Sequence, residues 1–218
     1  MIVEPISPGA IVSRVWQIYR EQFNVLVGTA MVLFAVQFVI YLVLPVTVGI
    51  ALVVLFWALS ILYQGMVVEL VQDIQDRRRD LSVTALLRSV EPVFWPLLAV
   101  SLLVGIGVAI GFVLLIVPGL VLMVMWSVVA PVTVLERPGV FAAFGRSREL
   151  IRGNGWNVFG VIALVFLAVA VVSIIAGTAS SSLGPVGRAL IQWVVNALVA
   201  PVTALSASVL YFALRGAA

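Results

Sequence analysis

Long apolar runs constrain the fold of this chain more than any other feature of its sequence. A helix crosses the bilayer core with about 20 predominantly apolar residues. Together these runs predict an all-α polytopic membrane protein with six transmembrane helices, forming one integral membrane domain over residues 1–218. None of the six runs contains a charged residue, and they cover residues 24–44, 46–68, 94–117, 118–135, 156–176 and 189–214.

The composition excludes several other classes of protein. Hydrophobic residues make up 64 % of the chain and charged residues 10 %, whereas soluble domains have about 45–50 % and about 25 %. A disordered chain and a nucleic-acid-binding domain are therefore excluded, and the absence of Cys excludes a disulfide scaffold. The chain also has no His and no Lys, so the commonest general base and the Schiff-base amine are missing. We therefore expect a non-catalytic protein without a metal or cofactor, and an intramembrane enzyme is the weakest hypothesis.

The arginines predict how the chain is oriented in the membrane. Turn residues at Pro45, at Pro118-Gly119 and within 180–185 would join the spans into three hairpins. The longer polar connections, 69–93 and 136–155, then lie on the other side of the membrane together with eleven of the twelve arginines, Arg188 being the exception. Short loops rich in arginine stay on the cytoplasmic side. The bias predicts a multi-pass protein of the cytoplasmic (inner) membrane with both termini in the cytoplasm.

An amphipathic stretch precedes each predicted hairpin. Around residues 11–24, 83–94 and 140–152, apolar residues recur at the spacing of one helix face, with arginines on the opposite face. We expect three interfacial helices on the inner leaflet, with apolar faces in lipid and arginines among the headgroups. The alternative is that these stretches are helical cytoplasmic linkers.

A sequence repeat accompanies the hairpin pattern. Val-Ala-Pro-Val-Thr stands at 129–133 and again at 199–203, which is 70 residues later. Five matching residues in apolar sequence are weak evidence alone, but their spacing agrees with the helix–hairpin period. The pattern predicts three related units, approximately residues 8–71, 82–136 and 138–215.

Prolines and glycines within the spans are candidate positions for hinges and for close packing. A proline removes one hydrogen bond of its helix and bends it, so Pro131 and Pro201 should kink the fourth and sixth spans. Gly65 occupies the equivalent place in the second span. Gly107 and Gly111 form a GxxxG pattern, which favours close approach between helices.

The candidate binding residues are polar groups within the spans and arginines beside them. Gln64 and Asn196 are candidates for lining a solute cavity, although such residues also hydrogen-bond neighbouring helices. An arginine near an acidic leaflet contributes about 1 kcal/mol to membrane binding. The arginines could instead act only as topology signals, and Glu149 can pair with arginines three residues away. The candidates for binding anionic headgroups are Arg77, Arg78, Arg79, Arg146, Arg148 and Arg152.

Residues 118–160 carry a more specific pattern, PGLVLMVMWSVVAPVTVLERPGVFAAFGRSRELIRGNGWNVFG. This stretch resembles a known membrane domain. The matching elements are Pro118-Gly119, Trp126, residues 130–132 and 134–136, and the arginines of 146–152. That domain is fused to some glycerophosphoryl diester phosphodiesterases and often stands alone in bacteria and archaea. The resemblance implies the six-span fold but not the enzyme activity. In the fused enzymes the reaction belongs to a separate soluble barrel that uses histidines and a metal, and this chain has no His.

Two functional hypotheses follow. The first is a non-catalytic module that organises membrane lipids, anionic phospholipid among them, or an unidentified protein partner. The second is a transporter or flippase for a small or lipid-like solute held between the hairpins. A polar cavity near the middle of the membrane would favour transport, whereas a closed and dry bundle would favour the organising module.

Overall fold

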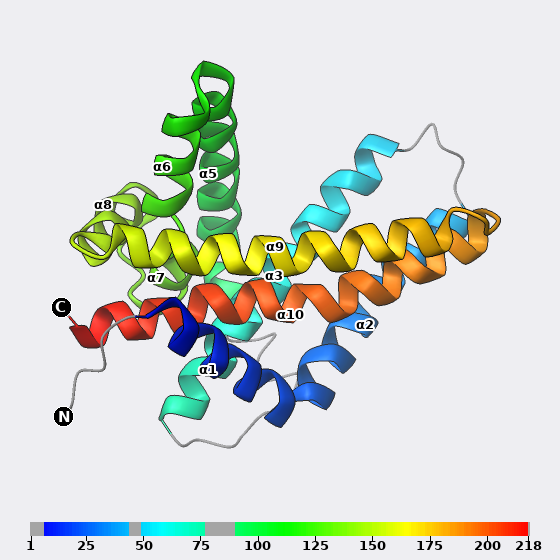
Figure 1. Ribbon diagram of the computed structural model, residues 1–218, viewed down its shortest axis with the longest axis horizontal. Helices are drawn as coiled ribbons and strands as arrows, with labels where there is room; N and C mark the ends of the chain where they lie inside the picture. Colours follow the sequence, from blue (N-terminus) through cyan, green and yellow to red (C-terminus); the bar gives the residue numbers. More distant parts are fainter. Residues whose placement is uncertain (1–6, 44–48, 77–89, 218) are drawn as a thin grey trace.

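The computed structural model describes residues 7–43, 49–76 and 90–217, and every regular element within these ranges is helical (Figure 1). The predicted all-α class is therefore confirmed. In chain order the elements are α1 (Pro8–Glu21), α2 (Phe23–Val43), α3 (Gly49–Gln75), the 3-10 turn η2 (Glu91–Val93), α5 (Phe94–Leu114), α6 (Ile116–Met125), α7 (Val129–Leu135), α8 (Val140–Ile151), α9 (Gly155–Ser180) and α10 (Pro185–Ala217).

Five helical segments of the described residues are long and apolar enough to cross a membrane. A shorter apolar helix, Phe23–Val36, lies within α2 at the place of the first predicted span. The chain is therefore an all-helical protein of the membrane-embedded kind. The five segments are Val54–Gln75, Glu91–Leu114, Ile116–Leu135, Gly155–Ser180 and Pro185–Gly216.

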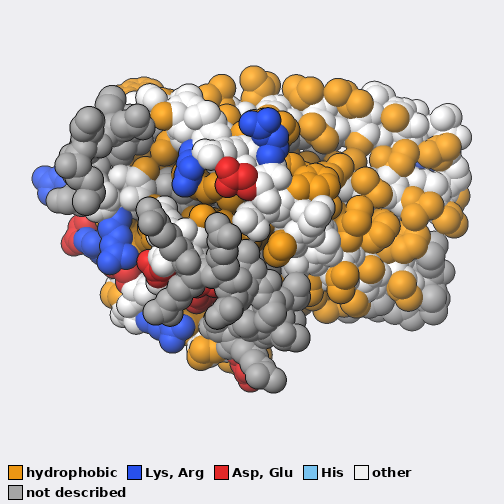
Figure 2. Space-filling view, turned by 90° about the horizontal axis from the view of Figure 1, so that it is seen from below, with side chains coloured by type: hydrophobic (Ala, Val, Ile, Leu, Met, Phe, Trp, Pro, Cys, Tyr) orange, Lys and Arg blue, Asp and Glu red, His pale blue; other side chains and the backbone are white. Residues whose placement is uncertain are grey.

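Charged and apolar surfaces lie at opposite ends of the molecule. Helix α8 and the C-terminal end of α10 lie at one end in Figure 1, and the connection between α9 and α10 lies at the far end. The hairpin of α5 and α6 points away from α9 and α10. On the face that Figure 2 shows, charged side chains gather toward the end where α8 lies, while hydrophobic side chains cover most of the other end.

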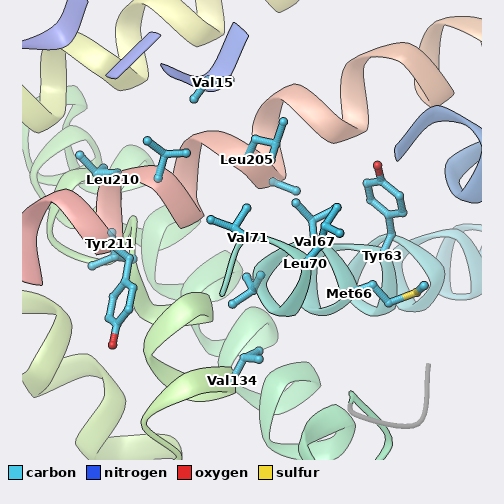
Figure 3. Packing of buried hydrophobic residues seen from close by; sticks show 14 of the residues in the cluster. Val15, Tyr63, Met66, Val67, Leu70, Val71, Val134, Leu205, Leu210 and Tyr211 are labelled. Atoms are coloured by element: carbon cyan, nitrogen blue, oxygen red, sulfur yellow. The ribbon is translucent and has the colours of Figure 1, made fainter. Parts of the chain in front are cut away.

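The core is built around α3 and α10. Helix α10 packs against α1, α2, α3 and α9. Tyr63, Met66 and Leu70 of α3 and Leu205 and Leu210 of α10 are almost completely buried in this core (Figure 3). In lipid there is no hydrophobic driving force for helices to associate. Helix association there depends instead on close van der Waals packing such as these contacts provide.

Aromatic side chains link neighbouring helices through hydrogen bonds to backbone carbonyls. Tyr63 Oη of α3 donates to the carbonyl of Leu26 at 3.0 Å. Trp193 Nε1 of α10 donates to the carbonyl of Met31 at 3.3 Å. Both carbonyls belong to α2, so α3 and α10 each hold α2 in place with one hydrogen bond.

Helix α1 buries its apolar face against protein. It packs on α10 and α9, and Tyr19 Oη donates to the carbonyl of Leu198 at 3.3 Å. Burial raises the pKa of Tyr19 above its ordinary value, so the hydroxyl keeps its proton. We expected the whole apolar face to lie in lipid, and the structure differs because α9 and α10 offer it a protein surface. The buried residues of α1 are Ile11, Val15, Ile18 and Tyr19.

The two other predicted amphipathic helices differ in how much of them the structure describes. Helix α8 corresponds to the third predicted amphipathic helix, 140–152. Its buried face includes Ala143, Ser147 and Leu150, whereas Phe141 is exposed. Gly139 precedes α8 with φ of 92°, a backbone conformation that favours glycine. The second predicted helix, 83–94, lies mostly outside the described residues.

Glycines allow α5 and α6 to pack very closely. A Cβ atom at Gly111 would lie 2.9 Å from Cα of Gly119, and one at Gly107 would collide with the ring of Trp126. A Cβ atom at Gly65 of α3 would lie 2.8 Å from Cγ1 of Val90. The structure thus places Gly107 and Gly111, which were predicted to pack closely, and Gly65, which was predicted as a hinge, at close contacts between segments.

Candidate functional site

The two predicted cavity residues, Gln64 and Asn196, line the same cavity. This small cavity has a volume of about 370 Å³ and lies between α2, α3, α5 and α10. Phe34, Phe56 and Trp57 form much of its apolar wall. Gln64 lies near the middle of the apolar segment Val54–Gln75, so the cavity lies at the depth of a span rather than at its end.

A larger cavity of about 660 Å³ adjoins the small one. Residues of α3, α5, α6, α7, α9 and α10 surround it. Gly105, Ala109 and Phe112 of α5 and Phe166 of α9 line it and are also exposed, so it opens to the outside of the helix bundle between α5 and α9. Both volumes lie within the roughly 300–1,000 Å³ typical of small-molecule sites.

Polar side chains separate the two cavities. Gln64, Ser101 and Thr203 line both of them, and we call these three residues the polar partition. Thr203 Oγ1 donates to the carbonyl of Ala200 at 2.9 Å, which leaves its oxygen lone pairs as acceptors. Within the described residues the side chains of Gln64 and Ser101 make no hydrogen bond. The partition therefore has hydrogen-bonding capacity that the described residues do not use.

A break in the fourth apolar segment forms part of the large cavity. Helix α6 ends at Met125 and α7 begins at Val129, with turn residues between them. Trp126 and Ser127 of this break line the large cavity. The hydroxyl of Ser127 is buried and has no hydrogen-bond partner among the described residues. Non-helical backbone at membrane depth is tolerated where it lies within protein or lines a cavity, and this break does so.

The two predicted hinge prolines have different surroundings. Pro131 is buried in the first turn of α7, just after the break. Pro201 is also buried, but α10 continues through it as one helix from Pro185 to Ala217. A proline in a first turn removes no helix hydrogen bond, because that N–H has no partner there. The same five-residue motif thus lies in two different backbone settings.

Helix α8 packs directly on the break. Ser147 Oγ donates to the carbonyl of Met125 at 2.8 Å, the last residue of α6. The ring of Phe144 contacts the ring of Trp126 edge-on, with centroids 5.1 Å apart. The position of α8 is therefore coupled to the backbone that lines the large cavity.

An ionic network joins α8 to the C-terminal end of α10. Glu136 accepts a hydrogen bond from Arg146 Nε at 2.9 Å and another from Tyr211 Oη at 2.8 Å. Arg215 Nη1 donates to Tyr211 Oη at 3.4 Å. Arg146 also contacts Glu149 at 3.4 Å. The hydrogen bond to Glu136 raises the pKa of Arg146, so this guanidinium stays charged and paired.

The six predicted headgroup arginines do not form one group. Arg146 is held by Glu136, whereas Arg148 and Arg152 are exposed. In residues 90–217 neither of these two makes an ion pair, although pairing of Glu149 with Arg152 was expected. Arg77, Arg78 and Arg79 lie outside the described residues.

Replacing Glu136 with glutamine should destabilise the protein by about 1–3 kcal/mol, because the buried Tyr211 hydroxyl and the Arg146 guanidinium lose a charged acceptor. Glu149 is the matched control: its side chain is 71 % exposed, so E149Q should change stability by less than about 1 kcal/mol. Thermal unfolding in detergent measures both. Equal melting temperatures for the two variants would contradict a structural role for Glu136.

Sequence reasoning did not single out several residues of this site. Ser101 did not stand out because isolated serines are common in apolar helices, and Ser127 was marked only by its place four residues before Pro131. Nothing in the sequence links Tyr211 to Glu136. The structure also shows no group of three or more acidic side chains that could hold a metal within residues 7–43, 49–76 and 90–217.

Comparison of the chain with protein-family models, with curated proteins and with solved structures finds no match. The resemblance of residues 118–160 to the phosphodiesterase-associated membrane domain stays a prediction.

Proposed function

We propose that this protein is a non-catalytic membrane protein that binds a lipid-like solute in the large cavity, as a carrier of the transporter or flippase class does. One observation supports this above all: an interrupted helix lines a cavity that opens between α5 and α9. Discontinuous helices form the solute sites of many transporters. An opening toward the side of the bundle suits a solute that arrives from the bilayer.

The organising module is the second candidate function, and the exposed aromatic residues at the charged end favour it. Trp95, Phe141 and Trp156 are 72 %, 84 % and 86 % exposed, as aromatic anchors at a membrane interface are. Two contacts weaken the part of this hypothesis that places three interfacial helices on the inner leaflet. The apolar face of α1 is covered by protein, and Arg146 is already paired with Glu136.

The carrier proposal includes six membrane crossings, with α2 as the first and both termini in the cytoplasm. Eleven of twelve arginines support this orientation. So does the position of α8 and the C-terminal end of α10 at one end of the molecule.

Cysteine labelling tests the orientation, because the native chain has no Cys that could react. In intact cells, a membrane-impermeant maleimide should label an S181C variant, whose site is exposed in the α9–α10 connection. It should label an R148C variant only after the cells are made permeable. The reverse pattern would contradict the proposed orientation.

Native mass spectrometry tests the function. Delipidated protein in a non-ionic detergent is titrated with 1-oleoylglycerol, with its 3-phosphate and with lysophosphatidylcholine. The proposal expects saturable binding of one molecule of at least one of these lipids. Only weak binding that rises linearly with lipid concentration would overturn it.

A further inference from the structure

We infer that the preferred occupant is a lipid with a single chain and an uncharged, hydrogen-bonding head, with its chain in the large cavity and its head at the polar partition. This inference rests on the proposed function and names the chemistry of its solute. It is built on three observations: the walls carry no charge, the partition has unused hydrogen-bonding groups, and the apolar part of the site opens sideways.

The walls of both cavities are uncharged in the part of the chain that the structure describes. Their lining consists of apolar and aromatic side chains together with serine, threonine, glutamine and asparagine. Transfer of an unpaired carboxylate or phosphate into such a site is very unfavourable. The ionic network around Glu136 and Arg146 is satisfied internally and lines neither cavity.

The polar groups at the partition match a hydroxyl or an ester. The Gln64 amide offers two donors and one acceptor, and no described residue occupies them. Ser101 offers one further hydroxyl, and Ser127 adds a buried hydroxyl without a partner at the break. Such neutral donors and acceptors pair well with an uncharged glycerol or alcohol head. A buried polar group without a hydrogen-bond partner destabilises the protein, and a bound head would supply that partner.

The remainder of the large cavity suits a hydrocarbon chain. Val104, Val108, Val165 and Val169 are among its lining residues on α5 and α9, and the exposed Phe112 and Phe166 stand where it opens. A chain entering from the bilayer would pass between α5 and α9 without crossing a charged group.

A matched pair of ligands tests the charge of the head. 1-Oleoylglycerol and 1-oleoylglycerol 3-phosphate differ only by the phosphate, so their chains make the same contacts. Native mass spectrometry of the purified full-length protein should show at least about tenfold tighter binding of the neutral lipid. Tighter binding of the phosphate ester would overturn the inference, and would favour arginine-bound headgroups instead.

Two substitutions at the partition test where the head lies. Q64L should weaken binding of 1-oleoylglycerol by roughly fivefold, because one or two hydrogen bonds are lost. Q64R should shift the preference toward the phosphate ester, because it supplies a cation for the phosphate. T29A is the matched control, since Thr29 is buried and lines neither of these two cavities, and it should bind as the wild type does.

The outcomes separate this inference from the proposed function. Saturable lipid binding that is unchanged in Q64L and Q64R would overturn the uncharged head at the partition, and the carrier proposal would stand. Absence of saturable binding by any of the lipids to the wild type would overturn both. Melting temperatures of each variant show whether it is folded, and a Ser101→Ala variant repeats the test should Q64L prove unstable.

Discussion

A Gly105→Phe variant is expected to lose saturable lipid binding by about a hundredfold or more, because a benzyl group would occupy space that the lipid chain needs. Gly105 lines the large cavity. Apart from its chain neighbours and the nearby backbone of α5, no atom of the described residues lies within 4 Å of a Cβ atom built there, so the position has room for the new ring. The measurement is the number of bound lipid molecules as a function of lipid concentration in native mass spectrometry.

Gly177→Phe is the matched control for this variant. Gly177 lies on α9, its Cβ position is equally open, and it does not line the large cavity. Both variants add the same side chain to an exposed helix position, so a general effect of the ring on the membrane-facing surface would appear in both. Wild-type binding by G105F would show that the solute does not use the large cavity.

A Gly111→Leu variant should lose about 3 kcal/mol or more of stability, since overpacking of an already tight contact commonly costs 1–3 kcal/mol even where side chains can move. The Cβ of Leu would lie 2.9 Å from Cα and 3.0 Å from the backbone nitrogen of Gly119. A backbone cannot move aside as a side chain can. The α5–α6 hairpin would therefore have to separate, and the free energy of unfolding should fall.

Gly177→Leu provides the comparison here too, because leucine at this open position should keep or slightly raise stability through its better helix propensity. Thermal unfolding in mixed micelles reports the difference. Equal stability of the two variants would mean that α5 and α6 are not in contact at Gly111.

The fold could be predicted largely because membrane helices must be apolar along their length. Six charge-free runs indicated helices, and α9 coincides closely with the run 156–176. The fourth run, 118–135, is instead divided between α6 and α7, and the turn before it lies at Leu115 and not at Pro118-Gly119. The pattern of α1 predicted an apolar face, but the same face suits lipid or protein equally. Only the packing of Ile11 and Val15 against other helices decides between them.

The candidate site was predictable in part. Gln64 and Asn196 stood out because polar amides are rare within apolar spans, and both line the small cavity. A disturbance of the helix near Pro131 was predicted, but the motif could not show that only this copy accompanies a break, because the identical five residues around Pro201 lie in an unbroken helix. Contacts that only the folded chain creates, such as the hydrogen bond from Ser147 to Met125, accompany the break.

The uncharged walls of the two cavities have a consequence for energetics across the membrane. Moving one elementary charge through a potential of 100 mV changes its free energy by about 2.3 kcal/mol. Neither the lining described here nor an uncharged lipid would carry such a charge. Occupancy of the site would then follow the concentration of the lipid in the bilayer and would not respond to the membrane voltage.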